Sequence, residues 1–590
     1  MSELIEVPTE PLEIDAAIRD CLAPPRSFAQ AYGRALFGPP FTIFVHEVAE
    51  RAVADGVDAL FFLSRDGFVF RRIYELLTAP GSPHRKLPAR YLCLSRLPVL
   101  RALLEHGLTL KAVLSARNHL VDRARTVENT LVSLGLDAAM VAGLASRHGV
   151  DPAATFYDGT LHHPPLLNLL ADPELDVESR RVGHAAAEQV RRYLRQEGML
   201  GAGTAGLVDV GWGATIQDQL ADAIAALSPR PRLIGYYFGA NESLFHRRTP
   251  ENWMEAVMAS VYTPPGQLTL GNTAVFSFVG LVEEASRAPH GTCVGLAEEH
   301  GHVEPVLRDD GARAAEIAAE PELSRLQAGI IEYAGAYAQL LVERSFDAPT
   351  MRPLAMTALQ RAVFSPEPAE IDFWQGVHHT NDIGGIFEID EVLVTAPVPR
   401  WRRLIRWRSR SRDSMWTFGS VRYLIGRIGL LTYRLGWSRS KARRVLAPIN
   451  HRQHAIPFSD GPIGRSQPTH GASQAAVELD ESPVFEAAVT RADALAAADP
   501  GDNDAGSVPL VTDLMVLGTA LVIGANRIVP DRWYAGYRVV NDGIAISELA
   551  ERAPAIGRLA RSRRRWRGGG GGSPTLSSTH RYGARGVARR

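Results

Sequence analysis

The sequence has few cysteines and no long apolar run. Its 590 residues include only Cys21, Cys93 and Cys293, which are too far apart for a Cys-x-x-Cys pair and odd in number. This usage argues against a disulfide framework or a zinc knuckle and favours a reducing cytoplasm. The late apolar stretch from Leu514 to Ala525 is short of the roughly 20 residues that span a bilayer. Residues 1–20 lack the basic start and apolar core of a signal peptide, so we expect no export.

Repeats and the standard nucleic-acid-binding patterns are also missing. We find no internal repeat at solenoid spacing, and no helix-turn-helix or zinc-finger pattern. The net charge of -1 indicates nothing about partners, because local clusters of opposite sign cancel in it. The apolar content of 46% is ample for a buried interior, and the length predicts two or more folded units with linkers.

Helical and strand patterns alternate through residues 1–300. Apolar residues from Phe41 to Val53 recur at helical spacing and are followed by Gly56, a typical residue after a helix end. Strand-like runs are Asp58 to Leu63, Arg90 to Leu94, Gly206 to Val210, Arg232 to Ala240 and, as a fifth, Phe276 to Glu284. This alternation predicts an α/β domain with a parallel sheet covered by helices, and residues 99–200 form a helical insertion in it.

The remainder of the chain differs in composition from the first 300 residues. Residues 301–399 are predicted to be helical. They are followed by a basic Arg/Trp helical segment (400–447), a linker (448–508), a small appended element (509–550) and a disordered basic tail (551–590).

The Arg/Trp segment contains fourteen Lys or Arg residues against one acid between Arg400 and Arg444. Arginines interleaved with tryptophans suit a helix at an anionic membrane surface, so peripheral contact with the inner face of a membrane is one interpretation. A helical face packed on the α/β domain, with its arginines exposed, is the other. We regard nucleic acid as an unlikely partner for 400–444.

The first candidate site is the turn Ser64-Arg65-Asp66-Gly67 after a buried strand. A strand-end carboxylate can serve as base, metal ligand or nucleophile, and a glycine lets the backbone approach a ligand. Arg65 could bind a phosphate, or it could face solvent. Alternatively, Asp66 or Ser64 only caps the following helix.

The second candidate site is the run from Asp209 to Thr215. Its glycines Gly211 and Gly213 and its Thr215 precede a helix, where backbone N–H groups and the helix dipole favour a phosphate. A tight turn with Thr215 as N-cap is the alternative.

Weaker signals accompany these two sites. Ser95-Arg96 follows another strand and could contact a phosphate. Glu283, Glu284 and His290 could add acid and base groups to the same edge, or could be a solvated pair and a turn histidine. The adjacent histidines His162-His163 and His378-His379 have diverging side chains, which disfavours a metal site at either pair.

Several of these pieces together resemble a known family. They are Phe62-Leu63-Ser64-Arg65-Asp66-Gly67, Tyr91-Leu92-Cys93-Leu94-Ser95-Arg96, Val208-Asp209-Val210-Gly211-Trp212-Gly213, Gly235-Tyr236-Tyr237-Phe238-Gly239 and Ala288-Pro289-His290-Gly291. In this order, over about residues 30–390, they resemble predicted haloacid-dehalogenase-like hydrolases associated with bacterial surface-polysaccharide biosynthesis.

The resemblance implies a Rossmann-like fold and a phosphoryl-transfer site that binds Mg²⁺. Asp66 would match the second aspartate of that site, Ser95 its hydroxyl residue and Asp209 a metal-site acid. Ser64 stands where the nucleophilic aspartate belongs, which removes the phosphoenzyme route and one metal ligand. A second resemblance, of Leu207 to Thr215 to the phosphoribosyltransferase loop, has one acid where that loop has two.

These observations predict a hydrolase or transferase acting on a phosphorylated sugar or nucleotide-linked intermediate, in the cytoplasm and with a peripheral membrane position as an option. The predicted catalytic residues are Asp66, Asp209 and Ser64, and Asp66 and Asp209 would also hold the metal. The predicted substrate-binding residues are Arg65, Gly67, Ser95, Arg96, Gly211, Gly213 and Thr215. The alternatives are a catalytically silent ligand-binding or membrane-associated subunit of a polysaccharide-assembly system, and a phosphoribosyltransferase-like enzyme.

Overall fold

A computed structural model describes the larger, amino-terminal part of the chain. The described residues are 8–120, 124–156, 163–241, 244, 247–260, 279–309, 311–375, 377–380, 390–394 and 414–441. The expected linker, appended element and tail (448–590) lie outside the described residues, as do 400–413 and 442–447 of the Arg/Trp segment.

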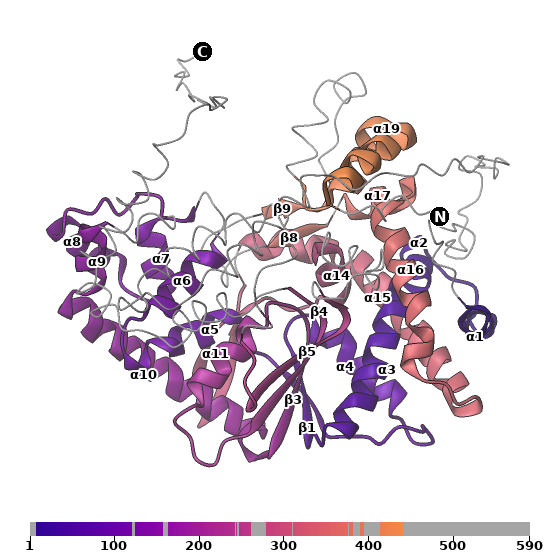
Figure 1. Ribbon diagram of the computed structural model, residues 1–590, viewed down its shortest axis with the longest axis horizontal. Coiled ribbons are helices and arrows are strands. Elements are labelled where there is room, and N and C mark those ends of the chain that lie inside the picture. The colour runs from indigo at the N-terminus through magenta and orange to yellow at the C-terminus, as the bar shows by residue number, and fades with distance from the viewer. Residues whose placement is uncertain are drawn as a thin grey trace, which may run out of the picture.

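The centre of the fold is a five-stranded parallel sheet in the order β2-β1-β3-β4-β5 (Figure 1). Its strands are β1 (Ala59–Leu63), β2 (Ala89–Leu92), β3 (Thr204–Trp212), β4 (Arg232–Ala240) and β5 (Asn252–Ser260). The first four confirm the strands expected from the sequence, and the α/β class with a parallel sheet is confirmed with them.

Helices cover both faces of the sheet, which is why β1 is apolar at every position. Leu60 and Phe62 of β1 belong to a core shared with α3 and α4, whereas Phe61 and Leu63 belong to a core shared with α10 and α11. A strand that is buried on both faces reads as a continuous hydrophobic run, as in parallel sheets generally.

The helices of the first face are those around the chain's beginning and those between residues 311 and 364 (Figure 1). They are α1 (Thr9–Asp20), α2 (Phe28–Tyr32) with the π-turn Gly33–Phe37, α3 (Gly38–Ala54), α4 (Gly67–Leu77), α15 (Gly311–Glu343) and α16 (Ala348–Phe364). Gly56 follows α3 with a φ of 69°, as its position in the sequence predicts.

The second face is covered by α5, α10 and α11, and the predicted helical insertion extends from it with a hydrophobic core of its own. The helices here are α5 (Arg96–Ala102), α6 (Leu110–His119), α7 (Val127–Ser133), α8 (Ala138–Arg147), α9 (Pro164–Leu170), α10 (Pro173–Gln196) and α11 (Thr215–Ala223), with short 3₁₀ turns at Leu103–His106 and Met199–Gly201.

One predicted strand is wrong. The described part of the run Phe276 to Glu284 lies in a helix, α14 (Val279–Ser286). Leu281 and Ala285, one helical turn apart, are both buried in the core shared with α3 and α4. The apolar residues of this short run therefore follow helical spacing and not the alternation of a strand. The fifth strand of the sheet is instead β5, which was not predicted.

The described part of residues 293–394 also contains two small antiparallel pairs and a short helix. These are β6 (Cys293–Glu299) with β7 (His302–Leu307), β8 (His378–Thr380) with β9 (Asp390–Val392), and α17 (Pro368–Trp374). Helices α15, α16 and α17 make up most of the described residues between 301 and 399, and β7, β8 and β9 are the strands there.

The described end of the chain is α19 (Thr417–Lys441), which has a break at Gly426 and packs near α16 and α17 (Figure 1). Trp416 precedes it and is fully buried, and its indole Nε1 donates a hydrogen bond to the carbonyl of Val363 at 3.0 Å. This tryptophan therefore packs on the α/β domain. None of the helices in the described part of the chain has both the length and the hydropathy of a membrane span.

Candidate functional site at the carboxyl edge of the sheet

The two predicted acids lie at the point where the strand order reverses. After β1 the chain goes to β2 on one side, and it then returns to β3 on the other side of β1. Phe62 pairs with Val208, so Asp209, inside β3, comes directly after the position level with Phe62, and Asp66 lies in the turn just after β1. In open parallel sheets, ligands bind in the crevice at this switch point.

Asp66 occupies the N-cap position of α4, but its side chain makes no capping hydrogen bond. The alternative interpretation, that Asp66 only caps this helix, is therefore wrong. Burial raises the pKa of Asp66 well above its usual range, and the charges of Glu283 and Asp209 raise it further. Asp66 is thus one of three acids, with Asp209 and Glu283, that lie close enough for their charges to interact.

Asp209 is the second acid of this group and is only 8% exposed. Burial raises its pKa to about 8 and the charge of Glu283 adds to that effect, although one carboxylate oxygen accepts a hydrogen bond from the Val210 N–H at 2.9 Å. The side chain therefore holds a proton near neutral pH, where most aspartates are ionised.

Glu283, from α14, completes the group. Its carboxylate accepts a hydrogen bond from the Trp212 indole at 2.9 Å and lies 3.5 Å from His379 Nε2. The neighbouring Glu284 is buried and pairs with Arg287 at 2.8 Å. The alternative interpretation of Glu283 and Glu284 as a solvated pair is therefore wrong.

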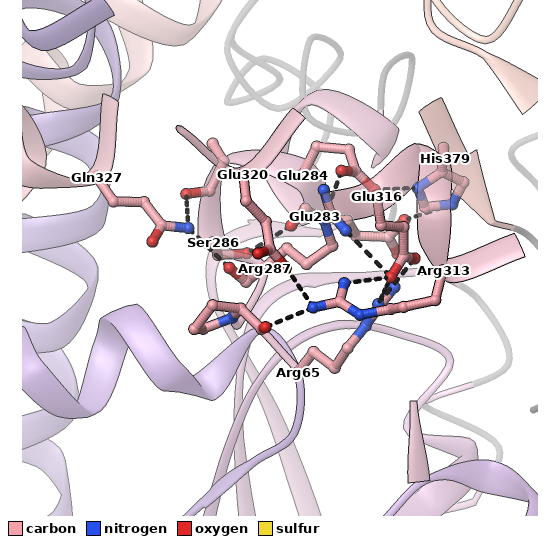
Figure 2. Close-up of polar contacts among 12 residues, drawn as sticks. Arg65, Glu283, Glu284, Ser286, Arg287, Arg313, Glu316, Glu320, Gln327 and His379 are labelled. Carbon is pink, nitrogen blue, oxygen red and sulfur yellow. Dashed lines mark hydrogen bonds and ion pairs between the residues drawn. The ribbon is translucent and has the colours of Figure 1, made fainter. Parts of the chain in front are cut away.

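A buried network of ion pairs and hydrogen bonds joins Arg65, Glu284, Arg287, Arg313, Glu316 and His379 (Figure 2). Glu316 of α15 is its centre, because the guanidinium groups of Arg65, Arg287 and Arg313 lie 2.7, 3.2 and 2.8 Å from it. Burial alone would raise the pKa of Glu316, but the charges of Arg65 and Arg287 outweigh burial and lower it to about 2. Arg65 was predicted to bind phosphate, and in this structure its guanidinium is paired with Glu316 and is 13% exposed.

His379 joins the same network from β8. Its Nδ1 lies 2.8 Å from Glu284. Burial alone would lower the pKa of His379, but the hydrogen bond with Glu284 and the charges of Glu283 and Glu284 raise it. The raised pKa favours the protonated imidazole, whose positive charge balances these glutamates.

The predicted serines connect elements around the site. The Ser64 hydroxyl donates to the carbonyl of Leu94 at 3.0 Å and so links the ends of β1 and β2. The Ser95 hydroxyl caps α5, where it accepts from the Leu97 N–H, and it donates to the carbonyl of Cys293 at 2.5 Å. Arg96 is exposed, and its charge acts to lower the pKa of Asp209.

The glycines Gly67 and Gly211 permit close packing. A Cβ on Gly67 would lie 2.7 Å from the backbone carbon of Phe62, so this glycine lets α4 start directly against β1. Gly211 has a φ of 135°, and a Cβ there would lie 2.0 Å from the Gly239 carbonyl oxygen on β4. Both are required by the backbone itself.

The loop from β3 to α11 is contacted by Arg247, a contact that the sequence did not predict. Arg247 donates to the Thr215 hydroxyl at 2.9 Å and to the carbonyl of Gly213. Thr215 is the first residue of α11, so the N-cap position belongs to Ala214, with a φ of 53°. The interpretation of Thr215 as N-cap is wrong. Arg247 and the N-terminus of α11 thus lie together beside β3, and Asp218 in the first turn of α11, 3.5 Å from Arg247, offsets part of their positive charge.

Cys93 and Cys293, 200 positions apart in the chain, also come together at this edge. A hydrogen bond with the Cys293 thiol lowers the pKa of the Cys93 thiol, and both cysteines are free. His290, from the predicted turn, contacts the Tyr91 hydroxyl through Nε2 at 2.8 Å. No local pattern in the sequence predicts these pairs, because each depends on the β2–α5 connection meeting the segment before β6.

The fit of the carboxylates to Mg²⁺ can be judged from the acids present. Mg²⁺ is commonly held by one or two carboxylates, with waters and substrate phosphate as its other ligands. Among the described residues, no group of three ligand atoms within 4.8 Å of one another includes Asp66 or Asp209. Asp66 and Asp209 would be the carboxylates that hold the ion, and its positive charge would offset the burial that raises their pKa values.

Comparison with models of known protein families finds no match, and comparison with curated proteins finds no significant relative.

Proposed function

We propose that the carboxyl edge of the sheet is the active site of a hydrolase or transferase acting on a phosphorylated sugar or nucleotide-linked substrate. The observation that supports this proposal is the meeting of Asp66, Asp209 and Glu283 at the switch point between β1 and β3. Burial and the charge of Glu283 raise the pKa values of Asp66 and Asp209, which favours a protonated carboxyl near neutral pH, and a general acid or base works best with a pKa near the operating pH.

The arrangement favours direct displacement over a covalent intermediate. Ser64, at the position of the family's nucleophile, donates its hydrogen bond to the Leu94 carbonyl. An ionised carboxylate of the group would accept the proton of a water or of an acceptor hydroxyl as that oxygen attacks the substrate. A protonated carboxyl of the same group would deliver its proton to the oxygen that leaves. One proton is thus taken up and one is released in each turnover.

The phosphate of the substrate would lie toward the start of α11. The N-terminus of that helix and the Arg247 guanidinium provide positive charge there, and the exposed Arg96 provides more. Binding of Mg²⁺ by ionised Asp66 and Asp209 would be an alternative to proton transfer by these two groups, and the ion would stabilise the transferred charge. A role in polysaccharide biosynthesis belongs to this proposal through the family resemblance.

A catalytically silent binding subunit is the second candidate function. The observation that favours it is the use of the Ser64 hydroxyl and the Arg65 guanidinium in structural contacts. Such a subunit would keep the anion site beside α11 and would bind the same phosphorylated molecules without turning them over.

The test is to incubate the protein with a panel of sugar phosphates and nucleoside-diphosphate sugars. Turnover is measured as the release of phosphate or nucleotide, with and without Mg²⁺. We expect Asp66→Asn and Asp209→Asn to lower kcat by about 10²- to 10⁴-fold, because each removes an acid or base. Asp372→Asn is the matched control, since Asp372 is exposed on α17. Wild-type binding without turnover would favour the silent subunit, and full turnover by both site variants would contradict the enzyme.

A further inference from the structure

A second cluster of ligand-type side chains lies apart from the carboxyl edge. His46 and Glu50 are one helical turn apart on α3, and His84 lies in the connection from α4 to β2. One ligand atom from each residue lies within 4.8 Å of the other two, and among the described residues this is the set of three that meets that criterion. Because the α4–β2 connection leads into the amino end of β2, the cluster is far along the strands from Asp66 and Asp209.

Each of the two imidazoles has a buried nitrogen without a hydrogen-bond partner among the described residues. His46 is fully buried, and its Nδ1 lies 2.8 Å from the Tyr337 hydroxyl. Its Nε2 lies 3.2 Å from Glu50 Oε1 without the geometry of a hydrogen bond. His84 Nε2 is also buried, and neither nitrogen has a hydrogen-bond partner among the described residues.

An unpartnered buried nitrogen is costly, and two of them beside one carboxylate need an explanation. Ligands of a tetrahedral zinc ion at bond lengths of about 2.0 Å lie about 3.3 Å apart. The 3.2 Å separation of His46 Nε2 and Glu50 Oε1 agrees with that spacing. The ring centroids of His46 and His84 are 4.6 Å apart, close enough for both rings to contact one ion.

We propose that His46, Glu50 and His84 bind a zinc ion, with two imidazole nitrogens and one carboxylate oxygen as its protein ligands. Two histidines and one glutamate are an established ligand set for Zn²⁺, and they leave the fourth position for water. The Tyr337 hydroxyl would accept the Nδ1–H of His46 and thereby fix the tautomer whose Nε2 faces the ion.

The surroundings indicate a structural role for this ion. Glu47, which follows His46 in the sequence, is directed away from the cluster, and its carboxylate pairs with Arg51 and Arg352. It is therefore not placed to activate a metal-bound water as a general base. The ion would instead join α3 to the α4–β2 connection, two elements that no strand pairing links.

The test is zinc binding by the full chain after removal of metal by a chelator, measured by competition with a zinc indicator dye. We expect one tight equivalent and a higher Tm on addition of Zn²⁺, since binding to the folded state stabilises it. Loss of a ligand in His84→Ala or Glu50→Gln should weaken binding at least about tenfold, and Tyr337→Phe, which removes only the outer hydrogen bond, by about 10- to 100-fold. Co²⁺ substituted for zinc should give the absorption of a tetrahedral site in the wild type but not in His84→Ala or Glu50→Gln.

His302→Ala is the matched control, because His302 is an exposed histidine on β7. It should bind zinc as tightly as the wild type does, and circular dichroism confirms that each variant is folded. Equal zinc affinity in the wild type, His84→Ala and Glu50→Gln would overturn the proposal. A wild-type protein that takes up no zinc would overturn it as well. These outcomes do not depend on the function proposed for the carboxyl edge.

Discussion

The guanidinium of Arg65 donates from one nitrogen to both carboxylate oxygens of Glu316, at 2.8 and 2.7 Å, across 251 positions of sequence. This pair links the turn after β1 to α15, where Glu316 also forms ion pairs with Arg287 and Arg313. The turn that carries Asp66 is therefore held in place by buried ion pairs to Glu316.

Replacement of Glu316 by Gln should destabilise the protein strongly. The change leaves Arg65, Arg287 and Arg313 buried without their shared carboxylate, and removal of one partner of a buried ion pair costs about 3–5 kcal/mol. Urea unfolding at neutral pH measures this loss. The control is Glu322→Gln, whose pair with Arg325 is about half exposed and contributes under about 1 kcal/mol. Equal stabilities of the two variants would show that the network is not a stabilising centre.

The sequence predicts where the candidate site lies better than it predicts which side chains form it. Strand ends could be recognised because the apolar runs before Ser64 and Asp209 stop at polar residues, and parallel strands present those ends at one edge. The order in which the strands pair, which makes Asp66 and Asp209 neighbours, could not be predicted from these local patterns.

Most of what could not be predicted concerns the interaction partners of the predicted residues. Glu316, His379 and Arg247 reach the site from distant elements, and no periodicity in the sequence marks them. Arg65 has the appearance of a phosphate ligand in isolation, and only the fold shows that a buried carboxylate neutralises it.

Short apolar runs were the other source of error. The stretch before Glu284 has too few residues to distinguish a strand from a buried helix by periodicity, and α14 is eight residues long. The strand β5 was not predicted because its pattern is not continuously apolar. Trp253 and Glu255 are half-buried at the edge of the sheet and interrupt that pattern.

Replacement of Asp209 by Asn should stabilise the protein in a pH-dependent manner. The folded-state pKa of Asp209 is raised from 3.8 to about 8, so the folded protein holds a proton that the unfolded chain releases between these values. Wild-type stability due to this group is full below pH 3.8 and is lost as the pH rises to about 8. Because Asn is neutral throughout, the variant's advantage should grow over this window.

The size of that advantage should reach a few kcal/mol, because each pKa unit corresponds to about 1.4 kcal/mol. Urea unfolding of both proteins at pH 5 and pH 8.5 measures it, and Asp372→Asn serves as the control for an exposed aspartate. A difference between Asp209→Asn and the wild type that is the same at both pH values would contradict the raised pKa.

Replacement of Gly211 by Ala should destabilise the sheet next to the site. The residue has a φ of 135°, which L side chains rarely adopt, and the new Cβ would lie 2.0 Å from the Gly239 carbonyl oxygen. Strain of this kind costs about 1–3 kcal/mol, and the displacement of β3 from β4 adds to it. Gly295→Ala on β6 is the matched control, because its φ is ordinary and a Cβ there meets no atom within 4 Å. Thermal unfolding should show a lower Tm for Gly211→Ala alone, and if Gly211→Ala were as stable as Gly295→Ala, the close approach of β3 and β4 would not be required.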